Sequence, residues 1–167
     1  QTLALLPQGT TVFSQHFSVT EPAAINQFCQ QAKQQWGDVD VLINCAGGNS
    51  SRSAATEPDW SAIEQMMQLN FYAPLHFIQQ LVPAMQQQGK GIVLNVLSTV
   101  CLFSNPGISA YSASKAALDS YSKVLRKELN GTGVKVLSVY PGGVDTEFRA
   151  ASRPDYLSAE EVADAIL

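Results

Sequence analysis

The sequence predicts an α/β domain built on a parallel sheet with helices on both faces. Short apolar segments alternate with longer amphipathic ones, and the short segments are nearly continuous in valine, leucine and isoleucine. Strands of that composition are buried on both faces, which is typical of parallel sheets, and right-handed crossovers between them give a doubly wound fold. The 167 residues, 46% hydrophobic and 14% charged, suit a single folded domain.

The first elements have clear local signals. Residues 11–17 are rich in β-branched and aromatic side chains, which favour a strand. Thr20 is the expected N-cap of a helix over residues 21–36, whose apolar side chains recur at helical spacing. Residues 39–43 form a short apolar run that predicts the second strand.

The middle of the chain predicts two long helices around a third strand. The helix over residues 59–85 is expected to begin at Asp59, and Pro74 inside it should bend it because proline removes a backbone N–H. Residues 91–97 are isoleucine, valine and leucine with one asparagine, and predict a strand. Residues 111–129 then predict the next helix.

The last part of the chain predicts a strand and a helix. Residues 134–140 form the fourth strand, and Ser158 with Glu161 forms a capping box that opens the final helix. In a doubly wound sheet, ligands bind beyond the carboxyl ends of the strands. We therefore expect the functional site to lie along that edge.

Composition excludes several classes of function. The net charge of −4 and the pI of about 5.0, with no basic stripe, argue against nucleic acid or an anionic membrane as partner. No apolar run approaches the roughly 20 residues of a membrane span, and no secretory leader is recognisable. Cys29, Cys45 and Cys101 form no paired motif, which fits a reducing cytoplasm. His16 and His76 stand alone, so no metal site is expected.

Three polar side chains are expected to meet at the sheet edge. Ser98 follows the third strand, Tyr111 comes thirteen residues later, and Lys115 lies four residues further on the same helix face. The pKa of a free phenol is about 10, and a nearby ammonium lowers it; a shift of about three units takes on the order of 4 kcal/mol. Ser98 is suited to donate a hydrogen bond to a carbonyl oxygen on which charge grows during reduction. The spacing alone also fits an exposed helical pair.

Other residues near the strand ends allow two interpretations. Asn44, Ala46 and Gly47 follow the second strand, where small side chains let a ligand approach the backbone; an ordinary glycine turn is the alternative. The segment that begins at Pro141 exposes glycine amides suited to a carboxamide or a phosphate, or it forms only a turn. Asn70 would bond backbone groups freed by the helix proline, or a water, or serve only the fold.

Together these residues resemble the short-chain dehydrogenase/reductase family, with order and spacing that agree over nearly the whole chain. Its Asn-x-Ala-Gly is Asn44, Ala46 and Gly47, its helix asparagine is Asn70, its serine is Ser98, its Tyr-x-x-x-Lys is Tyr111 and Lys115, and its Pro-Gly-x-Val-x-Thr is Pro141, Gly142, Val144 and Thr146. Any one motif is weak evidence, but four in register are strong. The resemblance implies one Rossmann-like domain over residues 1–167.

The resemblance also implies an enzyme that interconverts a carbonyl and an alcohol with NAD or NADP. Tyr111 would be the acid/base, Lys115 would lower its pKa and bind the nicotinamide ribose, and Ser98 would position the carbonyl. Asn70 would hold a water that links Lys115 to solvent. The hydride belongs to the cofactor. The residues implied to bind the cofactor are Ser18, Val19, Asn44, Ala46, Gly47, Tyr111, Lys115, Pro141, Gly142, Val144 and Thr146, the last two at the nicotinamide carboxamide.

The chain departs from the family at three places. The family opens with a strand, a glycine-rich turn that holds the diphosphate, a helix and a second strand, and none of these lies within the 167 residues; the family's last strand is also absent. We expect further chain to supply the opening segment, because a sheet without it exposes apolar surface. The 18.0 kDa chain alone is expected to be inactive. Ser18 stands where the family usually has an aspartate that binds adenine.

Two other functions fit parts of the sequence. A non-catalytic relative would bind nucleotide as a sensor or scaffold, and the intact catalytic set argues against it. A hydrolase of similar architecture needs Gly-x-Ser-x-Gly, whereas the segment around Ser109 ends in Tyr111. Family members pair the long helices that carry Asn70 and Tyr111 between subunits, which implies a homodimer or homotetramer. The partner molecule would be a small carbonyl or alcohol compound.

Overall fold

The computed structural model describes residues 6–103, 105–146 and 153–166. Its main sheet has three parallel strands in the order β1–β2–β3, formed by Val41–Asn44, Gly91–Val96 and Val134–Val139. The other elements are helices α1 (Pro22–Trp36), α2 (Trp60–Met67), α3 (Ala73–Gln88), α4 (Ser109–Glu128) and α5 (Ala159–Asp164), and a parallel pair of β4 (Val144–Asp145) with β5 (Leu157–Ser158). A parallel sheet with flanking helices confirms the predicted α/β class.

The strands of the main sheet are connected through helices. The chain passes from β1 through α2 and α3 to β2, and from β2 through α4 to β3, as parallel neighbours require. In the observed register Asn44 lies opposite Asn95, and Asn95 lies opposite Ser138. The carboxyl ends of all three strands therefore share one edge.

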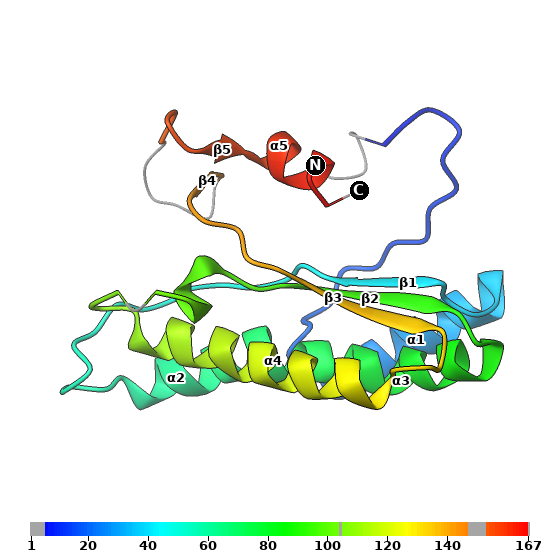
Figure 1. The fold of residues 1–167 in the computed structure, drawn as a ribbon, viewed down its shortest axis with the longest axis horizontal. Coiled ribbons are helices and arrows are strands. Elements are labelled where there is room, and N and C mark those ends of the chain that lie inside the picture. Colours follow the sequence, from blue (N-terminus) through cyan, green and yellow to red (C-terminus); the bar gives the residue numbers. More distant parts are fainter. Residues whose placement is uncertain (1–5, 104, 147–152, 167) are drawn as a thin grey trace.

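Helices cover only one face of this sheet. Helices α1 to α4 lie together on one side, whereas α5 lies on the other side and packs against β4 and β5 (Figure 1). The open face carries Val41, Ile43 and Leu137, which are 48%, 52% and 44% exposed. The described helices thus form one of the two layers expected around the doubly wound sheet. The strands are apolar on both faces, as in a sheet buried on both sides, but the described helices reach only one.

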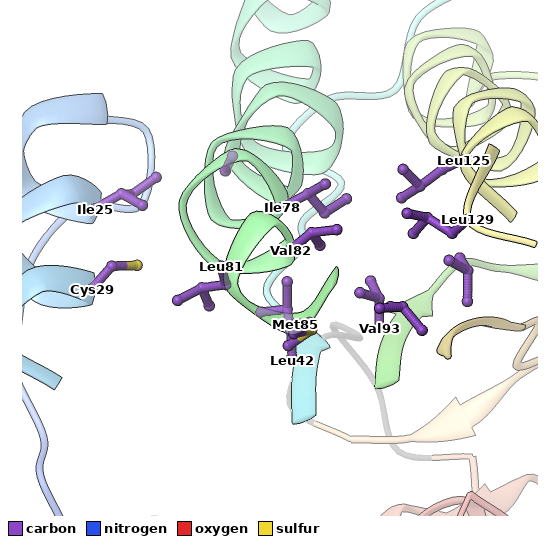
Figure 2. Close-up of a cluster of buried hydrophobic side chains, with 13 residues drawn as sticks. Ile25, Cys29, Leu42, Ile78, Leu81, Val82, Met85, Val93, Leu125 and Leu129 are labelled. Carbon is purple, nitrogen blue, oxygen red and sulfur yellow. The ribbon is translucent and has the colours of Figure 1, made fainter. Parts of the chain in front are cut away.

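The core fills the space between the sheet and these helices. Figure 2 shows side chains from α1, α3, α4 and the strands converging in one cluster. Ile25 of α1, Met85 of α3 and Val93 of β2 are each 0% exposed. Burial of an aliphatic side chain of this size stabilises a fold by about 1.5–3 kcal/mol. The cluster thus fixes α1 and α3 on the sheet.

The segment over residues 11–17 does not form the predicted strand. Residues 11–17 correspond to the third strand of a doubly wound sheet, which in the usual order pairs only with the second strand. The described residues contain no strand in the position of that second strand. The aromatic side chains pack instead on α1: the Phe13 ring stacks on Phe28 at 5.4 Å and meets Trp36 edge-on at 6.0 Å. The expected Thr20 cap of α1 is also wrong, because Glu21 is the N-cap and makes no side-chain bond.

The other predicted helix starts are confirmed. The Asp59 carboxylate accepts a hydrogen bond from the Ala62 amide at 3.0 Å and opens α2. Ser158 and Glu161 form a reciprocal capping box at the start of α5. Both caps satisfy backbone amides that have no partner within the first helical turn.

The helix that contains Pro74 is irregular before the proline. Residues Gln68–Tyr72 form a π-helical turn between α2 and α3, in which the Ala73 amide donates to the carbonyl of Gln68, five residues back. Pro74 has no N–H to give to the carbonyl of Asn70, and its ring crowds that carbonyl. The wider turn relieves this conflict and turns the Asn70 side chain inward, where it is 0% exposed.

Candidate active site

The site lies along the shared edge formed by the carboxyl ends of the strands. The segment from Cys45 to Gly48 follows β1, Ser98 follows β2, and Pro141 begins the segment after β3. The Thr99 amide donates to the Pro141 carbonyl at 3.0 Å, so the last two segments are joined directly beyond the sheet. Helix α4 starts beside this edge and carries Tyr111 and Lys115.

Asn70 fastens the segment after β1 to helix α4. Its Oδ1 accepts from the Gly48 amide, and its Nδ2 donates both to the Gly48 carbonyl and to the Ser114 hydroxyl, each at 2.9 Å. All three partner groups lie on segments remote from Asn70 in sequence. The side chain thus bonds backbone groups, as one sequence interpretation held, although these belong to Gly48 and not to its own helix.

The ammonium of Lys115 is buried beneath the same segment. Its Nζ donates to the Val96 carbonyl at 2.8 Å, and the residue is 4% exposed. A Cβ on Gly47 would lie 3.1 Å from Asn70 Oδ1 and 3.2 Å from Lys115 Nζ, so a larger side chain would press on both groups. Burial lowers the pKa of Lys115, and the nearby thiols of Cys101 and Cys45 partly oppose that shift.

Ser98 and Tyr111 line the outer part of the site. Ser98 is the N-cap of a short 3-10 helix, Thr99–Cys101, and its Oγ accepts from the Val100 amide at 3.3 Å. That contact uses a lone pair and leaves the hydroxyl proton for another acceptor. Tyr111 is half-buried in the first turn of α4, one turn before Lys115. The two side chains therefore start from the same face of the helix.

A second chain of polar groups ties α4 to the strands. Asn44 Nδ2 donates to Asn95 Oδ1 at 2.8 Å, and Asn95 Nδ2 donates to the Ser122 hydroxyl at 2.8 Å. The Ser122 hydroxyl in turn donates to the Leu118 carbonyl at 2.6 Å. The Asn44 side chain therefore bonds to the neighbouring strand β2 and holds the end of β1 in place.

The remaining predicted cofactor residues lie in two other segments. Pro141, Gly142, Val144 and Thr146 follow β3, where Val144 pairs with β5. Gly143 in this segment lies against the Tyr156 ring, since a Cβ there would come within 2.3 Å of it. Ser18 and Val19 precede α1: Val19 packs against the core, while the Ser18 and Thr20 hydroxyls are 2.7 Å apart. The segment after β3 joins the site through the Thr99–Pro141 bond, and Thr20 lines the same groove as Gly48.

A broad groove of about 1060 Å³ runs along α2 on the other side of the Gly48 segment. Its walls include Thr20, Gly48 and Asn49, together with residues of α2 and the π-helical turn. It does not include Ser98, Tyr111 or Lys115, so size alone does not mark the site that the polar side chains indicate. Within the described residues no group of His, Cys, Asp and Glu is arranged to hold a metal ion.

Comparison with known families identifies the family of this chain. A family profile described as short chain dehydrogenase matches residues 1–157. The chain belongs to the short-chain dehydrogenase family. The resemblance drawn from its motifs is thereby confirmed for the family. No helix in the described part of the chain is both long and apolar enough to cross a membrane.

Relatives within the short-chain dehydrogenases are substantially longer than this chain. An uncharacterised oxidoreductase of Staphylococcus saprophyticus is 38% identical over 128 residues, 77% of this chain and 54% of the relative. The fatty acyl-CoA reductase of Mycobacterium tuberculosis is 34% identical over 160 residues, 94% of this chain and 54% of the relative. The chain thus spans little more than half the length of these relatives.

Solved structures of this family share the fold. A short-chain dehydrogenase from Burkholderia cenocepacia, solved in complex with NADP, superposes with a TM-score of 0.80 at 31% identity over 91% of this chain and 62% of that one. An alcohol dehydrogenase from the archaeon Thermococcus sibiricus gives 0.86 at 24% identity over 95% of this chain and 68% of that one. The second likeness bears on the fold alone.

Sequence reasoning missed three residues that organise this site. Gly48, Ser114 and Asn95 bond directly to predicted site residues, yet none was singled out. Gly48 and Ser114 stand inside or beside recognised motifs, so their position next to Gly47 and Lys115 was a signal. Asn95 was visible as the one polar residue in an apolar strand.

Proposed function

We propose that this protein is an NAD(P)-dependent oxidoreductase that interconverts a carbonyl and an alcohol. The observation that carries the proposal is the buried Lys115 ammonium, one helical turn from Tyr111 and beneath the glycine segment after β1. Such a cation favours the phenolate form of a neighbouring tyrosine, which suits the tyrosine to exchange protons near neutral pH. The family and its oxidoreductase members support the same reaction class.

The residues of the site fit the nicotinamide end of the cofactor. The Gly47 backbone lies close to the Lys115 ammonium, as the 3.2 Å from a Cβ at Gly47 to Nζ indicates, and this ammonium can bind ribose hydroxyls. Val144 and Thr146 supply backbone and hydroxyl groups for the carboxamide. When bound, the nicotinamide supplies or accepts the hydride. The described residues contain no glycine-rich turn for the diphosphate.

The chain's own residues manage the proton and the carbonyl. In reduction Tyr111 gives its phenolic proton to the substrate oxygen, while Ser98 donates a hydrogen bond to the same oxygen as its negative charge grows. In oxidation the Tyr111 phenolate takes the hydroxyl proton. Lys115 keeps the phenolate accessible through its positive charge, and Asn70 holds the backbone above it.

The adenosine end is proposed to lie between the Ser18 segment and α2. Thr20 and Gly48 both line the large groove there, which gives room for an adenine ring. Ser18 can donate a hydrogen bond to the ring but adds no charge, so the contact is weaker than that of an aspartate. NAD and NADP both fit this arrangement. The relative solved with NADP supports a nicotinamide dinucleotide in general.

The test is a Tyr111→Phe substitution in the protein made from its complete gene. Turnover of NADH or NADPH with a panel of aldehydes and ketones should fall by at least about 100-fold, because the proton donor is lost. Cofactor affinity, followed by fluorescence titration, should stay within about threefold because the ring remains. Tyr121→Phe on the same helix, 39% exposed, is the matched control.

Three outcomes contradict parts of the proposal. Full activity in Tyr111→Phe excludes the tyrosine as acid/base. Tight cofactor binding without turnover across the panel indicates a non-catalytic nucleotide-binding relative. Activity in the isolated 18.0 kDa chain contradicts the expectation that this chain alone lacks the diphosphate site and is inactive.

We also propose a homodimer or homotetramer in the cytoplasm. Tyr72, Tyr121 and Val124 are 41%, 39% and 52% exposed on the outer faces of the long helices. Phe71 meets the Tyr121 ring edge-on at 6.2 Å, which brings these faces side by side. Sedimentation that shows only monomer at micromolar concentration contradicts the assembly. The free thiols fit a reducing compartment.

A further inference from the structure

Ser114 occupies a central place that the proposed chemistry does not use. It is 0% exposed and stands between Tyr111 and Lys115 in sequence. Its hydroxyl donates to the Tyr111 carbonyl at 2.9 Å and accepts from Asn70 Nδ2 at 2.9 Å. The single hydroxyl proton is used within α4, so its oxygen is available to Asn70 only as an acceptor.

This bond joins Asn70, which holds the segment after β1, to helix α4. The Asn70 amide already makes two bonds to Gly48, one from its oxygen and one from its nitrogen. Its second N–H reaches Ser114, so the amide bridges the segment after β1 and the helix that carries Lys115. The Gly47 backbone is thereby held within van der Waals reach of the Lys115 ammonium.

We propose that Ser114 is a positioning residue that, through Asn70, holds the Gly47–Gly48 segment closed over Lys115 before any ligand binds. A segment ordered in advance loses less conformational entropy when a ligand binds to it. The effect on cofactor binding rests on the proposed function, whereas the effect on the segment itself does not.

The environment of Lys115 reports whether the segment is closed. Burial is the main cause of its lowered pKa, and the titratable groups that act on it are the Cys45 thiol after β1 and the Cys101 thiol after β2. Burial raises the pKa of the Cys101 thiol above its ordinary value. If the segment loosens, water reaches the ammonium and the Lys115 pKa rises toward its ordinary value.

The experiment compares Ser114→Ala with Ser122→Ala in the protein made from its complete gene. Ser122 is a matched control: it lies two turns later on α4, is 0% exposed, donates to a backbone carbonyl and accepts from a buried asparagine. Lys115 is titrated by NMR of ¹³C,¹⁵N-labelled lysine, with its signal assigned through Lys115→Arg. Cofactor KM and kcat are measured in parallel.

The two serine variants should lose similar stability but differ at the site. In Ser114→Ala the Lys115 titration should move to higher pH, and the cofactor KM should rise about three- to tenfold with kcat within about twofold. Ser122→Ala should leave the Lys115 titration in place. If Ser114→Ala does not fold, Ser114→Cys keeps the shape and weakens both hydrogen bonds.

The outcomes separate the two proposals. An unchanged Lys115 titration in a folded Ser114 variant overturns the positioning role, as does an equal shift in Ser122→Ala. A wild-type protein that neither binds nor turns over NAD(P) overturns the proposed function, while the titration still decides the role of Ser114.

Discussion

Asn95 is the centre of the buried polar chain and offers a quantitative test of its energetics. It is 0% exposed, accepts from Asn44 Nδ2 and donates to the Ser122 hydroxyl, each at 2.8 Å. Asn95→Leu replaces the amide with a bulkier apolar side chain that has the same number of heavy atoms, so the change removes hydrogen bonds without opening a cavity.

The loss of stability can be worked out for each partner. Asn44 is 7% exposed, so its Nδ2 would be left buried without this acceptor, which costs about 1–3 kcal/mol. Ser122 keeps its bond to the Leu118 carbonyl and loses only an incoming donor, which costs about 1 kcal/mol. Asn95→Leu should therefore lower the free energy of unfolding by about 2–4 kcal/mol.

Urea denaturation followed by circular dichroism measures this loss, with the m-value checked for constancy. Asn44→Leu combined with Asn95→Leu removes both partners, so the double variant should regain at least about 1 kcal/mol relative to the additive expectation. A loss below about 0.5 kcal/mol for Asn95→Leu, or strict additivity in the double variant, would show that the buried bond does not contribute as reasoned.

Two further changes test the turn before β3 and the buried cation. Gly133→Ala should lower the free energy of unfolding by more than about 2 kcal/mol, because φ is +83° and a Cβ would lie 1.8 Å from the Gly89 carbonyl oxygen. Gly131 has a φ of +81° but open space around it, so Gly131→Ala should lower the free energy of unfolding by only about 1 kcal/mol in the same urea assay. Lys115→Met should abolish turnover yet stabilise the fold at pH 7 by about 1 kcal/mol, because it removes a buried charge. Burial lowers the pKa of Lys115 in the folded state, so the free energy of unfolding of the wild type should rise as the pH increases toward the ordinary lysine pKa of about 10.4. The difference in stability between Lys115→Met and the wild type should therefore narrow at high pH. A difference that does not change with pH refutes this reasoning.

Elements with a local signal could be predicted from the sequence. The starts at Asp59 and Ser158 are confirmed because a cap needs only residues within one helical turn. The prediction of a strand over residues 11–17 was wrong although the composition of this segment favours a strand, because a strand forms only where a neighbouring strand can pair with it. The irregularity near Pro74 was expected as a bend, but the five-residue π-helical turn was not.

The candidate site shows the same division. The motif residues after β1, β2 and β3 were expected to meet at one edge, and the parallel sheet places them there. The partners of each buried amide could not be predicted. Asn70 finds Gly48 22 residues away and Ser114 44 residues away, while Asn44 finds Asn95 51 residues away.

The sequence by itself determined the family, the alternation of helices and strands from residue 22 to residue 139, and which side chains follow each of those strands, because periodicity, capping and motif spacing are properties of neighbouring residues. Only the tertiary structure decided that Asn70 holds Gly48 against α4, that the Lys115 ammonium is buried against the Val96 carbonyl, and that one face of the sheet is left open. The physical reason is that a buried polar group takes whichever partner the packing of distant segments brings within about 3 Å, and no local pattern encodes that choice.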